Sequence, residues 1–175
     1  MRFIKEQLAA NREYPCTIRE LKTYLAMLPP ADVKGITSVK LMDGRRYGYQ
    51  DGEIIDRHKI ILVCTVDSDN VRIFKTKSFP GEYYTALWRE FSGQFGWNAS
   101  LRWVRWQSRD HLKRYMRFVL FHEVGHKAFW DAHGYRGKQT GAESQAEEEF
   151  CDQYARKYLD RCVQPSHAPG RSRQR

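Results

Sequence analysis

One long helix limits what this chain can fold into more than any other feature. Residues 111–133 read HLKRYMRFVLFHEVGHKAFWDAH, and their apolar side chains recur at the spacing of a helix face. Ser108 or Asp110 can cap the start of this helix, and Gly134 ends it. One mostly apolar stripe along it is formed by Tyr115, Val119, His122, His126 and Phe129. The two histidines are therefore expected to point toward the interior.

The histidine pair has the spacing of a metal site. His122 and His126 are four residues apart, so both imidazoles lie on one helix face, about 6 Å apart along the axis. Glu123 is turned by about 100° from His122, which places it near an ion without binding it. Zinc hydrolysis uses two nitrogen ligands and a carboxylate that takes a proton from bound water. The alternative is a chance match with two core histidines, and a third ligand distinguishes the two interpretations.

A second predicted helix can supply the third ligand. Thr140-x-x-Glu143 and Ser144-x-x-Glu147 are both capping boxes, so the helix starts near 141–145 and runs to about Cys162. Its apolar stripe consists of Cys151, Tyr154, Ala155, Tyr158, Leu159 and Cys162.

Two glutamates lie at the edges of that stripe. Glu147 and Glu148 flank it on opposite sides while Glu149 points away, so periodicity leaves either of the first two open as the ligand. Asp152 lies one turn after Glu148 and on the same side. Because a metal-bound histidine usually donates its second N–H to a carboxylate, Glu148 and Asp152 together can supply a ligand and a partner for a histidine.

The motifs HEVGH and EEFCDQYA, with Glu148 placed 22 residues after His126 (148 − 126), resemble those of the glutamate zincins. The closest resemblance is to the ImmA/IrrE-like family, whose second motif runs Glu-x-x-Ala-Asn/Asp-x-aromatic-Ala. The resemblance implies one zinc ion per chain, with His122, His126 and Glu148 as ligands and Glu123 as the base.

The resemblance covers residues 109–160 and also implies that Asp152 supports a ligand histidine from behind. The chain departs from the family pattern at Cys151, where alanine is usual. The segment RKYLDR also replaces the apolar ending that is common in the family.

On this resemblance the chain is expected to be a zinc-dependent endopeptidase in which Glu123 activates a zinc-bound water. The expected substrate is a specific intracellular protein, for example a transcriptional repressor, bound in extended form along an edge strand. A second donor to the developing oxyanion is usual in such enzymes. Tyr135 and His133, in the segment after the long helix, are the candidates, with an ordinary packing role as the alternative for each.

The SprT family of DNA-associated proteases is one alternative. It also has HExxH, often followed by a tryptophan as at Trp130, but its third ligand is a histidine. His133-Gly134 resembles the His-Gly pair of that family. However, His133 follows His126 by only seven residues, and the helix would have to turn back within a few residues to bring it to the metal.

A zinc-stabilised module that binds nucleic acid or protein is the other alternative. The net charge is +9, and the basic Trp-rich segment 97–117 contributes strongly to it. Aromatic side chains among basic ones can stack on bases and hold phosphates. The opposing interpretation is that the tryptophans are core and the arginines solvated. The residues concerned are Trp97, Trp103, Trp106, Arg102, Arg105, Arg109, Lys113 and Arg114.

The first half of the chain predicts short strands and two helices. ITSVKLM, RRYGYQ, HKIILVCTV and VRIFKTK are rich in β-branched and aromatic residues, and Asp43-Gly44, Asp51-Gly52 and DSDN punctuate them as turns. The capping box Thr17-x-x-Glu20 starts a helix that Pro29-Pro30 ends, and EYYTALWREF predicts a short helix.

These elements predict an α+β fold of zincin-like type, in which a small antiparallel sheet packs on the long HExxH helix and on a C-terminal ligand helix. Residues 1–164 are expected to form a single domain. Residues 165–175 are expected to be a basic, disordered tail, because Pro165 and Pro169 lead into an Arg/Ser-rich sequence.

Composition narrows the expected location. No apolar run approaches the roughly 18 residues of a membrane span, and the N-terminus has no continuous apolar segment of the kind found in secretory signals. The four cysteines form no C-x-x-C pair, which favours reduced thiols. The chain is therefore expected to be cytoplasmic, with no membrane partner.

Overall fold

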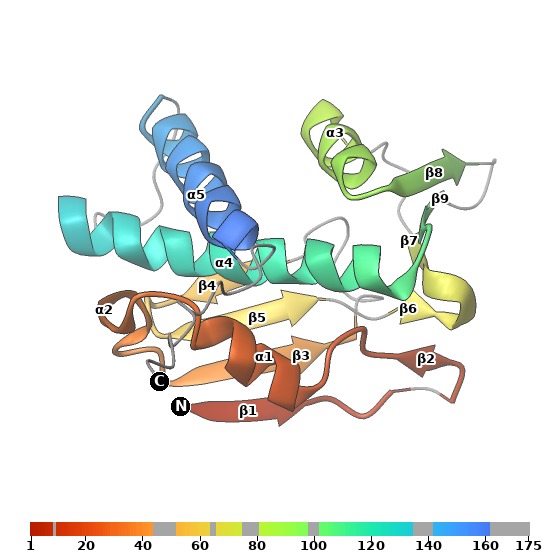
Figure 1. Cartoon of the computed structure of the whole chain (residues 1–175), viewed down its shortest axis with the longest axis horizontal. Coiled ribbons are helices and arrows are strands. Elements are labelled where there is room, and N and C mark those ends of the chain that lie inside the picture. The colour runs from red at the N-terminus through yellow and green to blue at the C-terminus, as the bar shows by residue number, and fades with distance from the viewer. Residues whose placement is uncertain are drawn as a thin grey trace, which may run out of the picture.

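The computed structural model describes residues 1–8, 10–43, 52–63, 66–74, 81–97, 102–134 and 142–161. These residues form a mixed α+β fold with two small sheets, a long helix α4 (Arg109–His133) and a last helix α5 (Ala142–Arg161). In Figure 1, α4 runs across the molecule with α5 above it and the first sheet below it. The long helix begins after Ser108, whose side chain accepts a hydrogen bond from the N–H of His111, and ends at Gly134, as the sequence predicts.

The first sheet is mixed, so the prediction of one small antiparallel sheet is wrong for this part of the chain. Its strands lie in the order β1 (Arg2–Lys5), β3 (Ser38–Met42), β5 (Lys59–Val63) and β4 (Gly52–Ile55). β1, β3 and β5 are parallel, and β4 is antiparallel to β5. A turn at Asp56 and Arg57, with φ of 51° and 62°, joins β4 to β5. Parallel strands pair across long sequence separations, which local turn signals do not reveal.

β4 forms one edge of this sheet and corrects a second expectation. The sequence Asp51-Gly52 reads as a turn, but Gly52 is the first residue of β4 and is paired with Leu62. β4 also contacts α4. An edge strand therefore borders the helix that carries the histidines.

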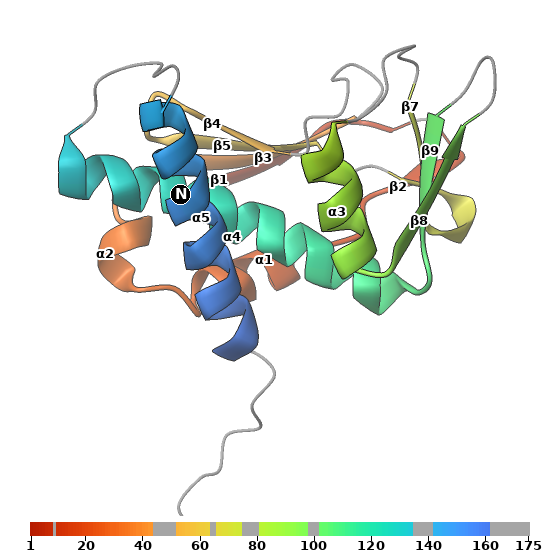
Figure 2. The ribbon, with the colours of Figure 1, turned by 90° about the horizontal axis from the view of Figure 1, so that it is seen from above.

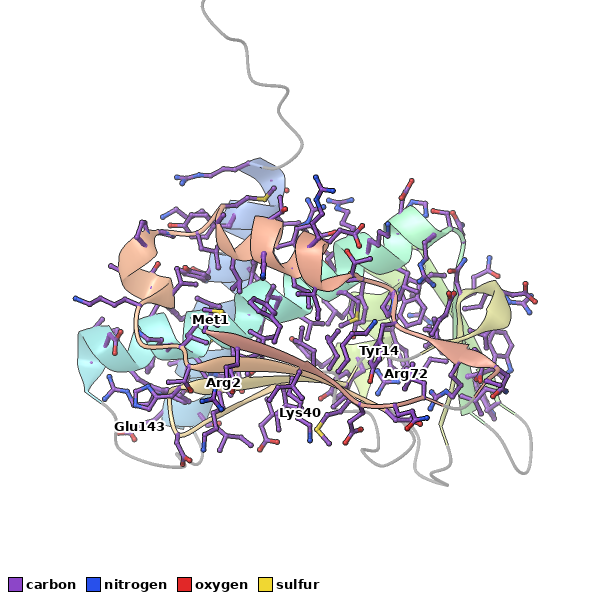
Figure 3. All side chains as sticks on the ribbon, turned by 90° about the horizontal axis from the view of Figure 1, so that it is seen from below. Met1, Arg2, Tyr14, Lys40, Arg72 and Glu143 are labelled. Atoms are coloured by element: carbon purple, nitrogen blue, oxygen red, sulfur yellow. The ribbon has the colours of Figure 1, made fainter. Side chains whose placement is uncertain are left out.

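The inner face of the first sheet packs against α1 (Ile18–Leu25) and α4. Val39, Leu41, Ile60 and Leu62 alternate along β3 and β5, and each is at most 1% exposed. Full burial of one such side chain stabilises the fold by about 1.5–3 kcal/mol. Figure 2 shows α1, α4 and α5 on the same side of this sheet. Lys40, between the buried residues of β3, lies on the opposite face, as Figure 3 shows.

The first helix follows its sequence signals. The N–H of Glu20 donates to Thr17 Oγ1 at 3.1 Å, and the N–H of Thr17 donates to Glu20 Oε2 at 2.8 Å, which confirms the predicted capping box. α1 ends at Leu25, and Pro30 opens a separate short helix, α2 (Pro30–Val33). Proline lacks an N–H and disfavours a helical residue before it, so the two helices cannot be continuous.

The second sheet is antiparallel among its described strands. Its order is β2 (Arg12–Glu13), β6 (Val66–Asp67), β7 (Val71–Phe74), β9 (Arg102–Trp106) and β8 (Gly93–Trp97). The one-turn helix η2 (Ser68–Asn70) lies where DSDN predicts a turn. The helix α3 (Glu82–Glu90) confirms the short helix that EYYTALWREF predicts.

The pairing of β8 with β9 has no counterpart in the sequence prediction. Gly96 lies opposite Trp103, and a β-carbon at position 96 would come within 2.5 Å of the indole Cζ2. The indole therefore covers the glycine and supplies the packing surface that the glycine lacks. A pair of this kind depends on cross-strand register, which the linear sequence does not state.

The two helices that carry the predicted site cross in close contact. A β-carbon at Gly125 would lie 3.0 Å from Cys151 Cα, so the backbones approach as closely as a glycine allows. The predicted stripe of α5 is buried as far as the structure describes it, and its residues are Cys151, Tyr154, Ala155, Tyr158 and Leu159. This crossing fixes which residues of α5 face the histidines of α4.

Residues 162–175 lie outside the described ranges, so the domain boundary at 164 and the basic tail stay predictions. Across the ranges that are described, every helix is too short or too polar to span a membrane.

The crossing generates a stability prediction. Gly125→Val should destabilise the protein by about 1–3 kcal/mol, because the added methyl groups collide with the backbone of α5. Ala132→Val, at an exposed position of the same helix, should cost only about 0.5 kcal/mol through helix propensity. Urea unfolding followed by circular dichroism measures both. Equal losses in the two variants would show that α4 and α5 do not meet at Gly125.

Candidate metal site

The two histidines of α4 face α5 from neighbouring turns. Their ring centroids are 4.9 Å apart, with the ring planes at 78° to each other. His122 is 9% exposed. Phe118 lies against His122 at 6.1 Å between centroids, and Trp130 lies against His126 at 5.7 Å. Because aromatic side chains pack on the outer side of each imidazole, both rings have little freedom to rotate away from each other.

Each histidine contacts a carboxylate of α5 through Nδ1. The distance from His122 Nδ1 to Asp152 Oδ1 is 2.9 Å, and the distance from His126 Nδ1 to Glu147 Oε1 is 2.6 Å. A carboxylate at Nδ1 fixes a proton on that nitrogen, so Nε2 is the nitrogen that can bind a metal ion once it has lost its own proton. This is the arrangement that supports ligand histidines in many metal sites.

Glu148 meets both histidines from the other side. Its Oε2 lies 3.1 Å from His122 Nε2, and its Oε1 lies 3.7 Å from His126 Nε2. Ligands that lie about 2.0–2.2 Å from a tetrahedral zinc ion are about 3.4 Å from one another. The two observed separations fall on either side of that value, so the distance from Glu148 to each histidine is close to that between two ligands of one zinc ion. Periodicity leaves Glu147 and Glu148 open as ligands, and the structure places Glu147 at an Nδ1 and Glu148 at the two Nε2 atoms.

Cys151 is a second candidate for the third donor. The Sγ of this buried cysteine and one ring nitrogen of each histidine lie within 4.8 Å of one another, so His122, His126 and Cys151 also form a group that could hold a metal ion. Burial, reinforced by the charges of Glu148 and Glu123, raises the pKa of the Cys151 thiol above its ordinary value. A metal prefers the thiolate, and this environment disfavours it.

We favour Glu148 over Cys151 as the third donor for two reasons. Its two oxygens lie 3.1 and 3.7 Å from the Nε2 atoms of His122 and His126, so one carboxylate reaches both rings. Burial raises the pKa of Glu148, but its hydrogen bond to His122 and the charges of both histidines outweigh burial, so the pKa lies below its ordinary value. Glu148 is therefore ionised at neutral pH and ready to bind a cation.

Glu123 is the buried acid of the site. It is 6% exposed, and burial raises its pKa above the ordinary value, although the charges of His122 and His126 act in the opposite direction. A carboxylate with a raised pKa is a better proton acceptor than a solvated one. Glu123 thus has the position and the environment expected of a base beside a metal ion.

A cavity of about 430 Å³ opens in front of the site. The elements that line it are β4, α3, α4 and α5. In Figure 2, α5 and α3 cross α4 at separate points. The edge strand β4 contributes Gly52, Glu53 and Ile54. The other residues that line the cavity belong to α3, α4 and α5, and they are Tyr83, Tyr84, Leu87, Tyr115, Phe118, Val119, His122, Glu123, His126, Trp130, Ser144, Glu147 and Glu148.

The tyrosines of α3 are site residues that the sequence reasoning missed. The hydroxyl of Tyr83 donates to Asp152 Oδ1 at 2.9 Å, and Asp152 in turn contacts His122. Tyr84 lines the same cavity, and burial followed by the charges of Glu148 and Glu123 raises its pKa. The only local signal is the pair of tyrosines in EYYTALWREF, and nothing in the sequence states that this helix lies over the histidines.

A buried cation lies near the aromatic wall of the cavity. Arg72 of β7 is 2% exposed, and Figure 3 shows it within the molecule. Burial lowers its pKa from 12.5 to about 10, while the nearby hydroxyls of Tyr115 and Tyr84 oppose the shift. Arg72 therefore keeps its charge at neutral pH and places a positive potential near the tyrosines of the cavity.

Of the two residues predicted as oxyanion donors, the structure describes His133 alone, and it does not line the cavity. His133 is exposed at the end of α4, stacks on Phe129 with 4.3 Å between ring centroids and contacts the carbonyl of Phe129 through Nδ1 at 2.9 Å. Tyr135 lies outside the described residues. The packing interpretation is therefore the better one for His133.

The basic Trp-rich segment 97–117 is partly absorbed by the fold. Trp106 is 2% exposed and stacks in the core, whereas Trp97 is 58% exposed. The guanidinium of Arg109 donates to the carboxylate of Glu13 at 2.5 Å and to the backbone carbonyl of Tyr14 at 2.7 Å. These contacts favour the structural interpretation for the buried members, while nucleic-acid binding by the segment stays a prediction.

Scans of this chain against protein-family models, curated proteins and solved structures found no match. The resemblance to the glutamate zincins therefore stays a prediction from the motifs of the sequence.

The contacts of His122 predict a pH effect on stability. Burial lowers the pKa of His122, but hydrogen bonds to Asp152 and Glu148 outweigh it and raise the pKa from 6.5 to about 10. A raised pKa in the folded state gives stability that is fully present below pH 6.5 and is lost as pH rises toward 10. In EDTA, the urea midpoint of the wild type should fall relative to that of His122→Gln across this range. If the difference between the two urea midpoints stays constant with pH, the raised pKa of His122 is wrong.

The Asp152 contact predicts an effect on metal affinity. Asp152→Ala should weaken zinc binding by about 10–100-fold, because His122 loses the carboxylate that orients its ring. Competition with a fluorescent zinc chelator measures this. Asp160→Ala, an exposed change on the same helix, should leave affinity unchanged. Equal affinities for Asp152→Ala and the wild type would remove Asp152 from the site.

Proposed function

We propose that the chain is a zinc-dependent endopeptidase of the glutamate-zincin type, resembling the ImmA/IrrE-like family. The observation that carries the proposal is the position of Glu148, whose two oxygens face the Nε2 atoms of His122 and His126 at 3.1 and 3.7 Å. The Nδ1 atoms are occupied by other carboxylates, so the three donors left over are the ones a zinc ion needs.

Glu123 supplies the acid–base chemistry in this proposal. It lies beside the first histidine of the pair, lines the cavity and has a raised pKa. A bound zinc ion would polarise the scissile carbonyl and lower the pKa of a bound water toward about 7. Glu123 takes the proton of the attacking water and passes it to the leaving amine, which completes hydrolysis of one peptide bond.

The cavity supports an extended peptide as the substrate. β4 is an edge strand, and its residues Gly52 to Ile54 line the cavity beside the histidines. An edge strand presents unpaired backbone groups to which a peptide can add as a further strand. The cavity also combines apolar and aromatic side chains with several carboxylates. In this proposal the substrate is a specific intracellular protein, such as a transcriptional repressor, rather than a broad range of proteins.

A SprT-like site with three histidines is less well supported. The face of α5 that meets the pair carries Glu147, Glu148 and Asp152, and His133 is exposed at the far end of α4. A metal-stabilised binding module would need the same ligands but not Glu123. The role of Glu123 therefore distinguishes an enzyme from a binding module.

The decisive test is Glu123→Gln. The change keeps size and helix propensity but removes the base, so zinc content should stay near one per chain while cleavage falls by about 10²-fold or more. The zinc-loaded wild type and the variant are incubated with lysate of the source organism, and new N-termini are identified by mass spectrometry. Glu149→Gln, an exposed neighbour on α5, is the matched control and should cleave as the wild type does.

His122→Ala should lose both zinc and cleavage, because it removes a ligand. Loss of zinc in Glu123→Gln would make Glu123 a ligand or a structural brace. New N-termini that are equally abundant with Glu123→Gln and with the wild type would exclude the proposed mechanism.

A further inference from the structure

The edge strand contacts the proposed base at a single glycine. A β-carbon built at Gly52 would lie 2.5 Å from Glu123 Oε1 and 2.9 Å from Glu123 Cδ. It would also lie 2.8 Å from Val119 Cγ1, on the preceding turn of α4. Contacts of this length do not occur for real β-carbons, so the Glu123 carboxylate occupies the place that any other residue would fill.

Backbone conformation does not explain a glycine at this position. The positive-φ glycines of the described chain are Gly35 and Gly134. Gly52 is not among them and is paired within a regular strand, where most residues have higher propensity than glycine. Position 52 therefore requires glycine for steric reasons, because side-chain atoms of Glu123 and Val119 occupy the volume of a β-carbon.

Steric contact also has to orient Glu123. Within the described residues, the side chain of Glu123 has no hydrogen-bond or ion-pair partner, whereas Asp152, Glu147 and Glu148 each have at least one. A buried carboxylate without such partners is held by the surfaces that it touches. On one side that surface is the backbone of β4 at Gly52.

We propose that Gly52 is a positioning residue for Glu123: its missing side chain lets the carboxylate lie flat against the edge strand, at the distance from the histidine pair that acid–base catalysis needs. This inference rests on the proposed function for its catalytic consequence. The contact itself does not depend on that function. If Glu123 acts as the base, the scissile bond of a peptide bound along β4 lies beside Gly52, at the start of the strand.

The test is Gly52→Ala, with Gly81→Ala as the matched control. Gly81 has an ordinary φ, and a β-carbon there meets no atom within 4 Å, so the same chemical change is made without a collision. Gly52→Ala should lower Tm by about 5 °C, as expected for overpacking. Gly81→Ala should lower it less, because Gly81 is the N-cap residue of α3 and alanine there loses only a capping preference. Both variants should still bind one Co²⁺ per chain, because the histidines keep their partners.

Two further readouts separate positioning from a loss of stability alone. The visible spectrum of the Co²⁺-loaded protein should change in Gly52→Ala and stay unchanged in Gly81→Ala, because only the first variant moves a carboxylate beside the ion. Glu123→Asp shortens the side chain by about 1.5 Å and so makes room for a β-carbon at position 52. In the Glu123→Asp background, Gly52→Ala should therefore lower Tm by at most half as much as it does in the wild type. An unchanged spectrum together with equal losses of Tm in the two backgrounds would overturn the proposal.

The catalytic consequence is read on any peptide that the zinc-loaded wild type cleaves. For Gly52→Ala, kcat should fall by about 10²-fold with KM within about twofold, since a displacement of about 1 Å costs this much and the backbone of β4 that would pair with a peptide is unaltered. Equal kcat in Gly52→Ala and the wild type would overturn the positioning role. If the wild type cleaves no peptide, the proposed function fails, and the Co²⁺ spectrum and the two losses of Tm still decide whether Gly52 positions Glu123.

Discussion

The close approach of α4 and α5 at Gly125 is the constraint on which the rest of the site depends. With the backbones in contact there, the second and third turns of α5 lie opposite the two histidines, and no other described element supplies carboxylates at that distance. Three acids and two imidazoles can be gathered there because their charges oppose one another, with Glu147 and Asp152 largely buried and Glu148 about half exposed. Glu147 and Asp152 would be costly to bury alone, and each contacts the Nδ1 atom of a histidine.

The sequence predicts the local elements well and the sheets poorly, for a physical reason. The capping box at Thr17, the cap at Ser108 and the stop at Gly134 are short-range interactions, and all three are present. The parallel pairing of β1 with β3 joins segments more than thirty residues apart and leaves no local trace. A turn-rich sequence therefore suggests an antiparallel meander even where the strands pair in another order.

The candidate site divides in the same way. Helical periodicity brings His122 and His126 onto one face and narrows the third donor to Glu147 or Glu148, but it cannot choose, because the choice depends on where α5 crosses α4. The contribution of α3 is invisible in the sequence, since Tyr83 reaches Asp152 across 69 residues of chain. Gly52 reads as a turn for a similar reason, because a missing β-carbon looks the same whether it serves a turn or a neighbour's carboxylate.

The hydrogen bond from Tyr83 to Asp152 makes α3 a participant in the thermodynamics of the site. Asp152 holds Tyr83 with the same oxygen that faces His122, so the docking of α3 and the binding of a cation at His122 share one carboxylate. Two equilibria that share a group are linked, and the linkage is reciprocal. If docked α3 strengthens cation binding by some factor, a bound cation must strengthen the docking of α3 by the same factor. The cavity wall and the ion would then order one another, whichever is fixed first.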